Sequence, residues 1–153
     1  MHKTLKPEEW ESWNALLMLN RSVLQALDTE LRREHGLAVT EFDVLITLYN
    51  APNKRLGMSA LADRVLLSPA GTTHLVTRLE RGGMVRREAD EGDGRKRFTV
   101  LTDRGSEALG TARPTHDNAL RRSVLGITTA TERRTLQRLW KRLSQQQRPG
   151  AGS

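Results

Sequence analysis

Hydroxyl-bearing and basic side chains cluster between residues 68 and 81. The spacing of Leu75, Val76 and Leu79 predicts a helix with one apolar face. Ser68 and Pro69 mark its start, because serine caps helices and proline fits the first turn, and Ser68 has this role whatever else it contacts. Small hydroxyl groups can approach phosphates and thymine methyl groups, and arginine can contact a guanine edge or a phosphate. We therefore predict that these residues contact DNA: Ser68, Thr72, Thr73, His74, Thr77 and Arg78.

A second basic cluster lies a few residues further along. Residues 84–88 and 97–101 are rich in apolar, β-branched and aromatic residues, and turn formers separate them, so we predict a two-stranded hairpin with a charged tip. Arg95 lies at this tip, and Asp93, two residues earlier, can orient it. The neighbouring basic side chains either neutralise phosphates or are only solvated: Arg86, Arg87, Lys96 and Arg97.

Combinations of residues typical of catalysis or metal binding are missing from the sequence. It has no cysteine, which excludes disulfides, thiolate metal centres and cysteine nucleophiles. Its histidines, at positions 2, 35, 74 and 116, are not paired, and there is no glycine-rich phosphate loop or Gly-x-Ser-x-Gly motif. Solvated helix ends explain Glu30, Glu34, His35, Glu41 and His116 better than a zinc site does. We expect neither an enzyme nor a cofactor.

Length and composition indicate one basic, mainly helical domain covering residues 1–153. Aromatic residues are only 4% of the chain, so the core must be built from Leu, Val and Ala. The net charge is +7, and 20 of the 25 basic residues are arginine. Arginine suits contacts with phosphate and guanine, so a polyanionic partner is expected, although solvated helix faces explain part of the excess. No signal peptide or membrane span is recognisable, which predicts a cytoplasmic protein without a membrane partner.

The element that opens the chain is predicted to be a long helix over residues 7–35. Pro7 suits its first turn and Gly36 its end. Its apolar residues follow a heptad spacing with a second apolar edge beside it, which is more apolar surface than one subunit of this size can cover. One face for the chain's own core and one for a partner helix is the natural interpretation, and it predicts a homodimer. The heptad positions are Trp10, Trp13, Leu17, Asn20, Leu24, Leu27 and Leu31.

Further helices are predicted on both sides of the hairpin. A capping-box pattern starts one at Thr40, Ser59 can cap a short one that reaches Val65, and the helix after Ser68 completes a helix-turn-helix. After the hairpin, a helix beginning at Thr102 or Asp103 is expected to break or kink near Pro114. A last helix begins with the capping box of residues 129–132, and the tail 148–153 should be disordered.

This order of elements resembles the MarR family of bacterial winged-helix regulators from about residue 7 to residue 146. Its most specific stretch is Asp93-Gly94-Arg95 followed by residues 99–105, which looks like the family's wing motif of Asp-x-Arg and a strand ending Leu-Thr-x-x-Gly. Residues 59–65 and 68–85 are similar to the two segments of the family's helix-turn-helix. Each match is weak by itself, whereas the order and spacing of all of them are specific.

The resemblance implies a mainly α-helical homodimer with a winged module at residues 40–102. Residues 7–35 and 104–147 would form the dimerisation helices. The modules would bind double-stranded DNA, with Ser59 in the first helix-turn-helix segment, the helix after Ser68 in the major groove and Arg95 in the minor groove. It further implies a regulator, repressor or activator, tuned by a small ligand and associated with the nucleoid in a bacterial cytoplasm.

The ligand itself is a separate expectation. A urate-responding subgroup of the family carries a tryptophan in the first helix, an aspartate in the helix-turn-helix and an arginine toward the wing. Trp10, Asp63 and Arg95 fall in matching regions, with Trp13 beside them. We predict from this a pocket for a small anionic or aromatic ligand between the first helix and the helix-turn-helix. The alternatives are that both tryptophans belong to the dimer core and that Arg86 or Arg87 is the partner.

Two other functions are compatible with the sequence. A dimeric helical scaffold could dock an acidic protein on its basic faces. An architectural protein could bind DNA without choosing a sequence, because it would share the positive charge without the base-reading side chains.

Overall fold

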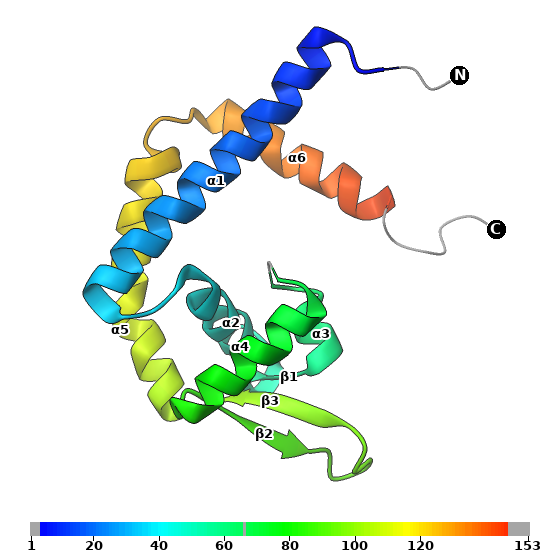
Figure 1. Cartoon of the computed structure of the whole chain (residues 1–153), viewed down its shortest axis with the longest axis vertical. Coiled ribbons are helices and arrows are strands. Elements are labelled where there is room, and N and C mark those ends of the chain that lie inside the picture. Colours follow the sequence, from blue (N-terminus) through cyan, green and yellow to red (C-terminus); the bar gives the residue numbers. More distant parts are fainter. Residues whose placement is uncertain (1–3, 66, 147–153) are drawn as a thin grey trace, which may run out of the picture.

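The computed structural model describes residues 4–65 and 67–146, so the predicted disordered tail lies outside the described residues. Seen along the chain in Figure 1, a long helix leads into a small winged module, and two further helices follow it. The helices are α1 (Pro7–His35), α2 (Val39–Tyr49), α3 (Met58–Ala62), α4 (Pro69–Arg81), α5 (Asp103–Leu120) and α6 (Ala130–Gln146). A short 3-10 turn (Pro52–Lys54) follows α2, and a π-helical turn (Arg121–Leu125) follows α5. The strands are β1 (Arg55–Gly57), β2 (Val85–Ala89) and β3 (Arg97–Leu101).

Local capping fixes the ends of the long helices. α1 begins at Pro7 and ends before Gly36, whose φ of 66° is the left-handed conformation that glycine adopts most easily. At the start of α6, Thr129 and Glu132 exchange hydrogen bonds as a capping box, with 2.7 Å between Thr129 N and Glu132 Oε2. Helix α1 therefore has both ends, and α6 its start, where the capping residues predict them.

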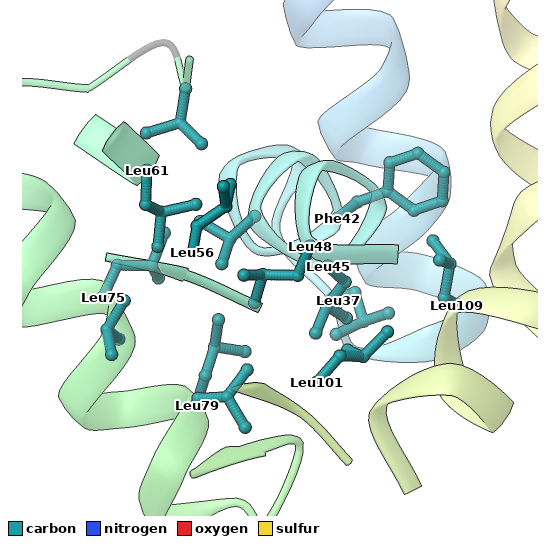
Figure 2. Close-up of a cluster of buried hydrophobic side chains, with 14 of the residues drawn as sticks. Leu37, Phe42, Leu45, Leu48, Leu56, Leu61, Leu75, Leu79, Leu101 and Leu109 are labelled. Atoms are coloured by element: carbon teal, nitrogen blue, oxygen red, sulfur yellow. The ribbon is translucent and has the colours of Figure 1, made fainter. Parts of the chain in front are cut away.

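The core lies between the winged module and the adjoining parts of α1 and α5, with α2 at its centre (Figure 2). Helix α2 is buried on several sides because α1, α3, α4, α5 and the sheet all pack against it. Leucine dominates, as the low aromatic content requires, and Phe42 is the aromatic member of the cluster. The buried leucines labelled in Figure 2 are Leu37, Leu45, Leu48, Leu56, Leu61, Leu75, Leu79, Leu101 and Leu109.

The sheet has one strand more than the predicted hairpin. β3 is its middle strand and pairs in antiparallel fashion with β2 on one side and β1 on the other, with Arg55 opposite Val100. No strand is predicted where β1 lies, because three residues are too few to show an alternating pattern. β1 leads directly into α3, so Gly57 is the N-cap of α3 and Ser59 lies inside the helix. The prediction that Ser59 caps a helix reaching Val65 is therefore wrong.

Helix α5 joins the wing to the last part of the chain. It runs through Pro114 without the predicted break. Its first turn lies against the start of β2, where a side chain at Gly105 would place a Cβ 2.1 Å from the carbonyl oxygen of Met84. Glycine at this position therefore lets α5 leave the sheet at close range.

Large apolar side chains are exposed at the start of α1 and along α6. Helix α6 has no buried residue, and it forms no extensive contact with other described elements. No helix among the described residues is both long enough and apolar enough to cross a membrane. The exposed apolar residues on these two helices are Trp10, Trp13, Leu16, Leu17, Met18 and Leu19 on α1, and Leu136, Leu139, Trp140 and Leu143 on α6.

Candidate nucleic-acid interface

The outward face of α4 carries most of the residues predicted to contact DNA. Ser68 caps the helix by accepting a hydrogen bond from the backbone N–H of Gly71, 3.1 Å away. Beyond the cap, a shallow groove runs along the exposed side of the helix. It is lined by Ala70, Thr73, His74, Thr77, Arg78 and Arg81.

Thr72 is not part of this face. Its side chain is fully buried, and its hydroxyl donates to the carbonyl oxygen of Ser68 at 2.9 Å. The prediction that Thr72 lies on the DNA-facing side is wrong, because residues 72, 75, 76 and 79 follow the i, i+3, i+4, i+7 spacing of a single buried stripe. The spacing alone indicates that Thr72 is buried, whereas its hydroxyl group suggests an exposed polar position.

Arg78 is held by a residue of a different helix. Its Nε and Nη2 lie 3.0 and 2.7 Å from Oε1 of Glu41, in the first turn of α2. The other carboxylate oxygen, Oε2, accepts a hydrogen bond from the backbone N–H of Ala38 at 2.7 Å. No sequence pattern indicates this ion pair, because the two residues lie in different helices and are far apart along the chain.

A second network joins α4 to the wing. Arg87 on β2 forms an ion pair with Glu80 and donates to the hydroxyl of Thr77 at 2.9 Å. Thr77 in turn donates to the backbone carbonyl of Thr73. This network holds the Thr77 hydroxyl in place and engages Arg87 in contacts within the chain. Arg86 instead forms a surface ion pair with Glu88.

The loop between β2 and β3 carries the predicted wing arginine. Asp93 accepts a hydrogen bond from the backbone N–H of Arg95 at 3.1 Å, so it shapes the turn that carries Arg95. Arg95 and Arg97 are both exposed, and Lys96 lies 4.0 Å from Asp93. Ser59 is exposed on α3, the first helix of the helix-turn-helix.

The four residues predicted to bind a ligand do not come together within one chain. Trp10 and Trp13 belong to the amino-terminal part of α1, and Arg95 belongs to the wing loop. These two segments lie at opposite ends of the long axis in Figure 1. Asp63 is the exposed C-cap of α3. The predicted pocket bounded by these four residues is therefore wrong for a single chain.

An apolar cavity of about 350 Å³ lies elsewhere, between α1, α2 and α5. The His116 ring stacks on Phe42, with 4.3 Å between ring centroids, and its Nδ1 is 2.9 Å from a carboxylate oxygen of Asp117. No local sequence motif predicts the cavity, because its walls come from three segments that are far apart in the chain. It is lined by Leu24, Leu27, Val39, Thr40, Phe42, Asp43, Ile46 and His116.

The residues weighed for a zinc site have other partners. The Thr115 hydroxyl lies 2.7 Å from the His35 ring and donates to Glu34, while Glu30 lies near Arg33 and Arg122. Among the described residues, no group of three His, Asp or Glu side chains is arranged to hold a metal ion.

Comparison with known proteins gives consistent matches. The MarR family model matches residues 35–96, from the end of α1 into the wing loop. The HTH-type transcriptional regulator YkoM of Bacillus subtilis is 35% identical over 96 residues, which is 63% of this chain and 61% of that protein. The transcriptional repressor MprA of Escherichia coli is 28% identical over 128 residues, or 84% of this chain and 72% of that protein. The chain thus spans about three fifths of the length of YkoM.

A solved structure extends the likeness to nearly the whole chain. Sco3205 of Streptomyces coelicolor, a MarR family transcriptional regulator solved in complex with DNA, superposes with a TM-score of 0.89 at 29% identity. The superposition covers 99% of this chain and 96% of that one. With its helix-turn-helix, its antiparallel wing and its flanking long helices, the chain has the fold of the MarR family of winged-helix regulators and is similar to its members in sequence.

Proposed function

We propose that the protein is a DNA-binding transcriptional regulator. The observation that carries this proposal is the outward face of α4, where Thr73, His74, Thr77 and Arg78 line one exposed groove. Arg95 and Arg97 stand on the adjoining wing, exposed and basic. A helix with hydroxyl and guanidinium groups fits the major groove, and an arginine on a loop fits the minor groove. Asp93 shapes the loop that presents Arg95, and Ser68 and Ser59 lie close enough to the module's surface to bind phosphates.

The working unit is a homodimer. Exposed apolar residues on α1 and α6 would leave large apolar patches in water in a monomer, and such patches mark association surfaces. We assign residues 7–35 and 104–147 to dimerisation and residues 40–102 to DNA binding. A two-fold axis would then place the two α4 helices in successive major grooves, so the operator is pseudo-palindromic with half-sites ~10 bp between centres.

Whether the protein represses or activates depends on where the dimer binds relative to a promoter. A dimer spanning two major grooves of a promoter blocks access to it, so we propose repression, which is also the role of the similar Escherichia coli transcriptional repressor MprA. The protein would work on the chromosome, in the cytoplasm of a bacterium and associated with its nucleoid.

We further propose that a small anionic or aromatic ligand binds the apolar cavity between α1, α2 and α5 and modulates DNA affinity. The cavity has apolar walls, an aromatic face at Phe42 and polar groups at Thr40 and His116, as small-molecule sites have. Its wall includes the first turn of α2, the same turn whose Glu41 holds Arg78. A ligand that favours a displaced first turn must lower DNA affinity by the same coupling factor.

The test is footprinting on the DNA beside the protein's own gene, with and without a panel of aromatic acids and purines. The expected result is one protected pseudo-palindrome of about two helical turns, with protection weakened by at least one compound. Uniform protection of all duplexes would favour an architectural protein. Absence of binding to any duplex at low salt, together with a stable dimer, would favour the scaffold.

A further inference from the structure

The contact between Arg78 and Glu41 uses one particular edge of the guanidinium. Nε and Nη2 both point at the same carboxylate oxygen, at 3.0 and 2.7 Å. A guanidinium is planar, and its N–H groups are arranged in forks that point in fixed directions. Once the Nε edge is directed at Glu41, the direction of the remaining fork, formed by Nη1 and Nη2, is fixed as well.

Glu41 is itself immobilised. Its side chain is only 12% exposed, whereas that of Arg78 is 54% exposed. Its second oxygen accepts the hydrogen bond from Ala38 N–H that caps α2, so the carboxylate is attached to the start of a helix inside the core. A fixed anion beneath an exposed cation differs from an ordinary surface ion pair, in which two mobile side chains meet and little is gained.

Arg78 lines the groove on the outward side of α4. Thr73, His74, Thr77 and Arg78 line the same groove, so Arg78 is presented together with the other exposed groups of the helix. Bidentate recognition of guanine needs two parallel N–H groups directed at O6 and N7, which a guanidinium supplies from one edge. A held side chain also loses less rotamer freedom on binding than a free one.

Resting on the proposed function, we infer that Glu41 is the positioning residue that makes Arg78 read a guanine base. Glu41 occupies the Nε edge, orients the Nη1–Nη2 edge toward the base pair, and offsets the charge that would otherwise draw Arg78 to a phosphate. Sequence discrimination at one base pair of each half-site therefore depends on a residue of α2 that does not touch DNA.

The experiment compares Glu41→Gln with the parent protein on three kinds of duplex: the footprinted operator, the operator with each G·C pair of a half-site changed to A·T in turn, and unrelated DNA. Glutamine is the chosen replacement because its amide oxygen can still accept the Ala38 N–H, so the start of α2 is preserved. The parent should discriminate roughly tenfold or more at one G·C pair, as a bidentate arginine contact does.

In Glu41→Gln the discrimination at this base pair should fall to within about threefold. The affinity for unrelated DNA should stay equal or rise. The magnitude of the slope of log affinity against log salt concentration should increase by about 1, as for one additional phosphate contact. Arg78→Ala should lose discrimination at the same base pair. Asp28→Asn is the matched control, because it weakens the hydrogen bond to Val39 N–H in the same turn of α2 and leaves the Glu41–Arg78 pair intact. It should lower thermal stability and keep the discrimination.

Retention of the parent's discrimination in Glu41→Gln overturns the inference and leaves the proposed function in place. An equal loss of affinity for all duplexes also overturns it, because that pattern indicates a structural role for Glu41 only. A parent protein with no sequence preference overturns the proposed function, and the inference with it.

Discussion

The carboxylate of Asp28 on α1 accepts a hydrogen bond from the backbone N–H of Val39, the first residue of α2, at 2.9 Å. The same carboxylate is held by Arg32 one turn further along α1, with 2.6 Å between Nε and Oδ2. Together with the Glu41 cap on Ala38, this contact satisfies N–H groups that a helix start otherwise leaves unpaired. Asp28 thus fastens the long helix to the winged module at a turn that also lines the apolar cavity.

Replacing Asp28 should therefore destabilise the junction. Asp28→Ala leaves Val39 N–H without its acceptor, and we expect the free energy of unfolding to fall by about 1–2 kcal/mol. Arg32→Gln serves as the control, because it removes only an exposed ion pair and should cost less than about 0.5 kcal/mol. Urea unfolding at pH 7 measures both changes. An equal effect of the two variants would contradict the importance of the Val39 contact.

The same contact predicts a pH dependence. Burial raises the pKa of Asp28, but the hydrogen bonds from Val39 N–H and Arg32 outweigh it and hold the pKa below the ordinary 3.8. A carboxyl with a lowered pKa in the folded state stabilises fully above its unfolded pKa, and this contribution is lost as the pH falls through the folded pKa. The stability difference between the parent and Asp28→Asn should therefore be constant from neutral pH down to about pH 5 and shrink below the ordinary carboxyl pKa. A difference that is unchanged at about pH 3 would contradict this assignment.

Gly105 should not tolerate a side chain. A Cβ there would lie 2.1 Å from the Met84 carbonyl oxygen and 2.7 Å from Leu101 Cδ1, so Gly105→Ala must push α5 away from the wing. We expect a loss of about 3 kcal/mol in thermal or urea unfolding. Gly110→Ala, in the same helix, meets no atom within 4 Å and should stabilise the protein by about 0.5–1 kcal/mol. Similar effects at the two glycines would contradict the close approach.

A charge on the exposed apolar side of α6 should prevent dimerisation. Leu139→Glu would place a carboxylate among Leu136, Trp140 and Leu143, and its desolvation opposes association. Sedimentation should show a monomer or unfolded chain at micromolar concentration, with loss of operator binding. Gln137→Glu adds the same charge at an exposed polar position of α6 and should remain dimeric. A dimeric Leu139→Glu protein would show that α6 lies outside the interface.

Removing the wing arginine should weaken DNA binding without changing sequence preference. Arg95→Ala deletes a contact driven by charge and groove width, so affinity should fall on all duplexes and the salt slope should decrease by about 1. Arg113→Ala, an exposed arginine on α5, removes the same charge away from the module and is the control. Binding titrations with duplex DNA at several salt concentrations measure the affinity and the salt slope of both variants. An unchanged slope in Arg95→Ala would exclude the wing from the interface.

Local patterns in the sequence determined the ends and kinds of the main elements. Pro7 and Gly36 bounded α1, Ser68 and Pro69 started α4, and Thr129 and Glu132 started α6, since each cap involves residues within one or two turns of one another. The wide apolar face of α1 could also be predicted from the sequence, because the face of a helix follows from the spacing of its residues.

Only the tertiary structure decided which polar residues are available to a partner. Thr72 is buried and Arg78 is tied to Glu41, although their residue types alone mark both as DNA contacts. β1 exists because it pairs with β3, and the cavity exists because α1, α2 and α5 meet around Phe42 and His116. These features depend on contacts between segments far apart in the chain, and the free energy of such contacts comes from packing and partner geometry that no local spacing encodes.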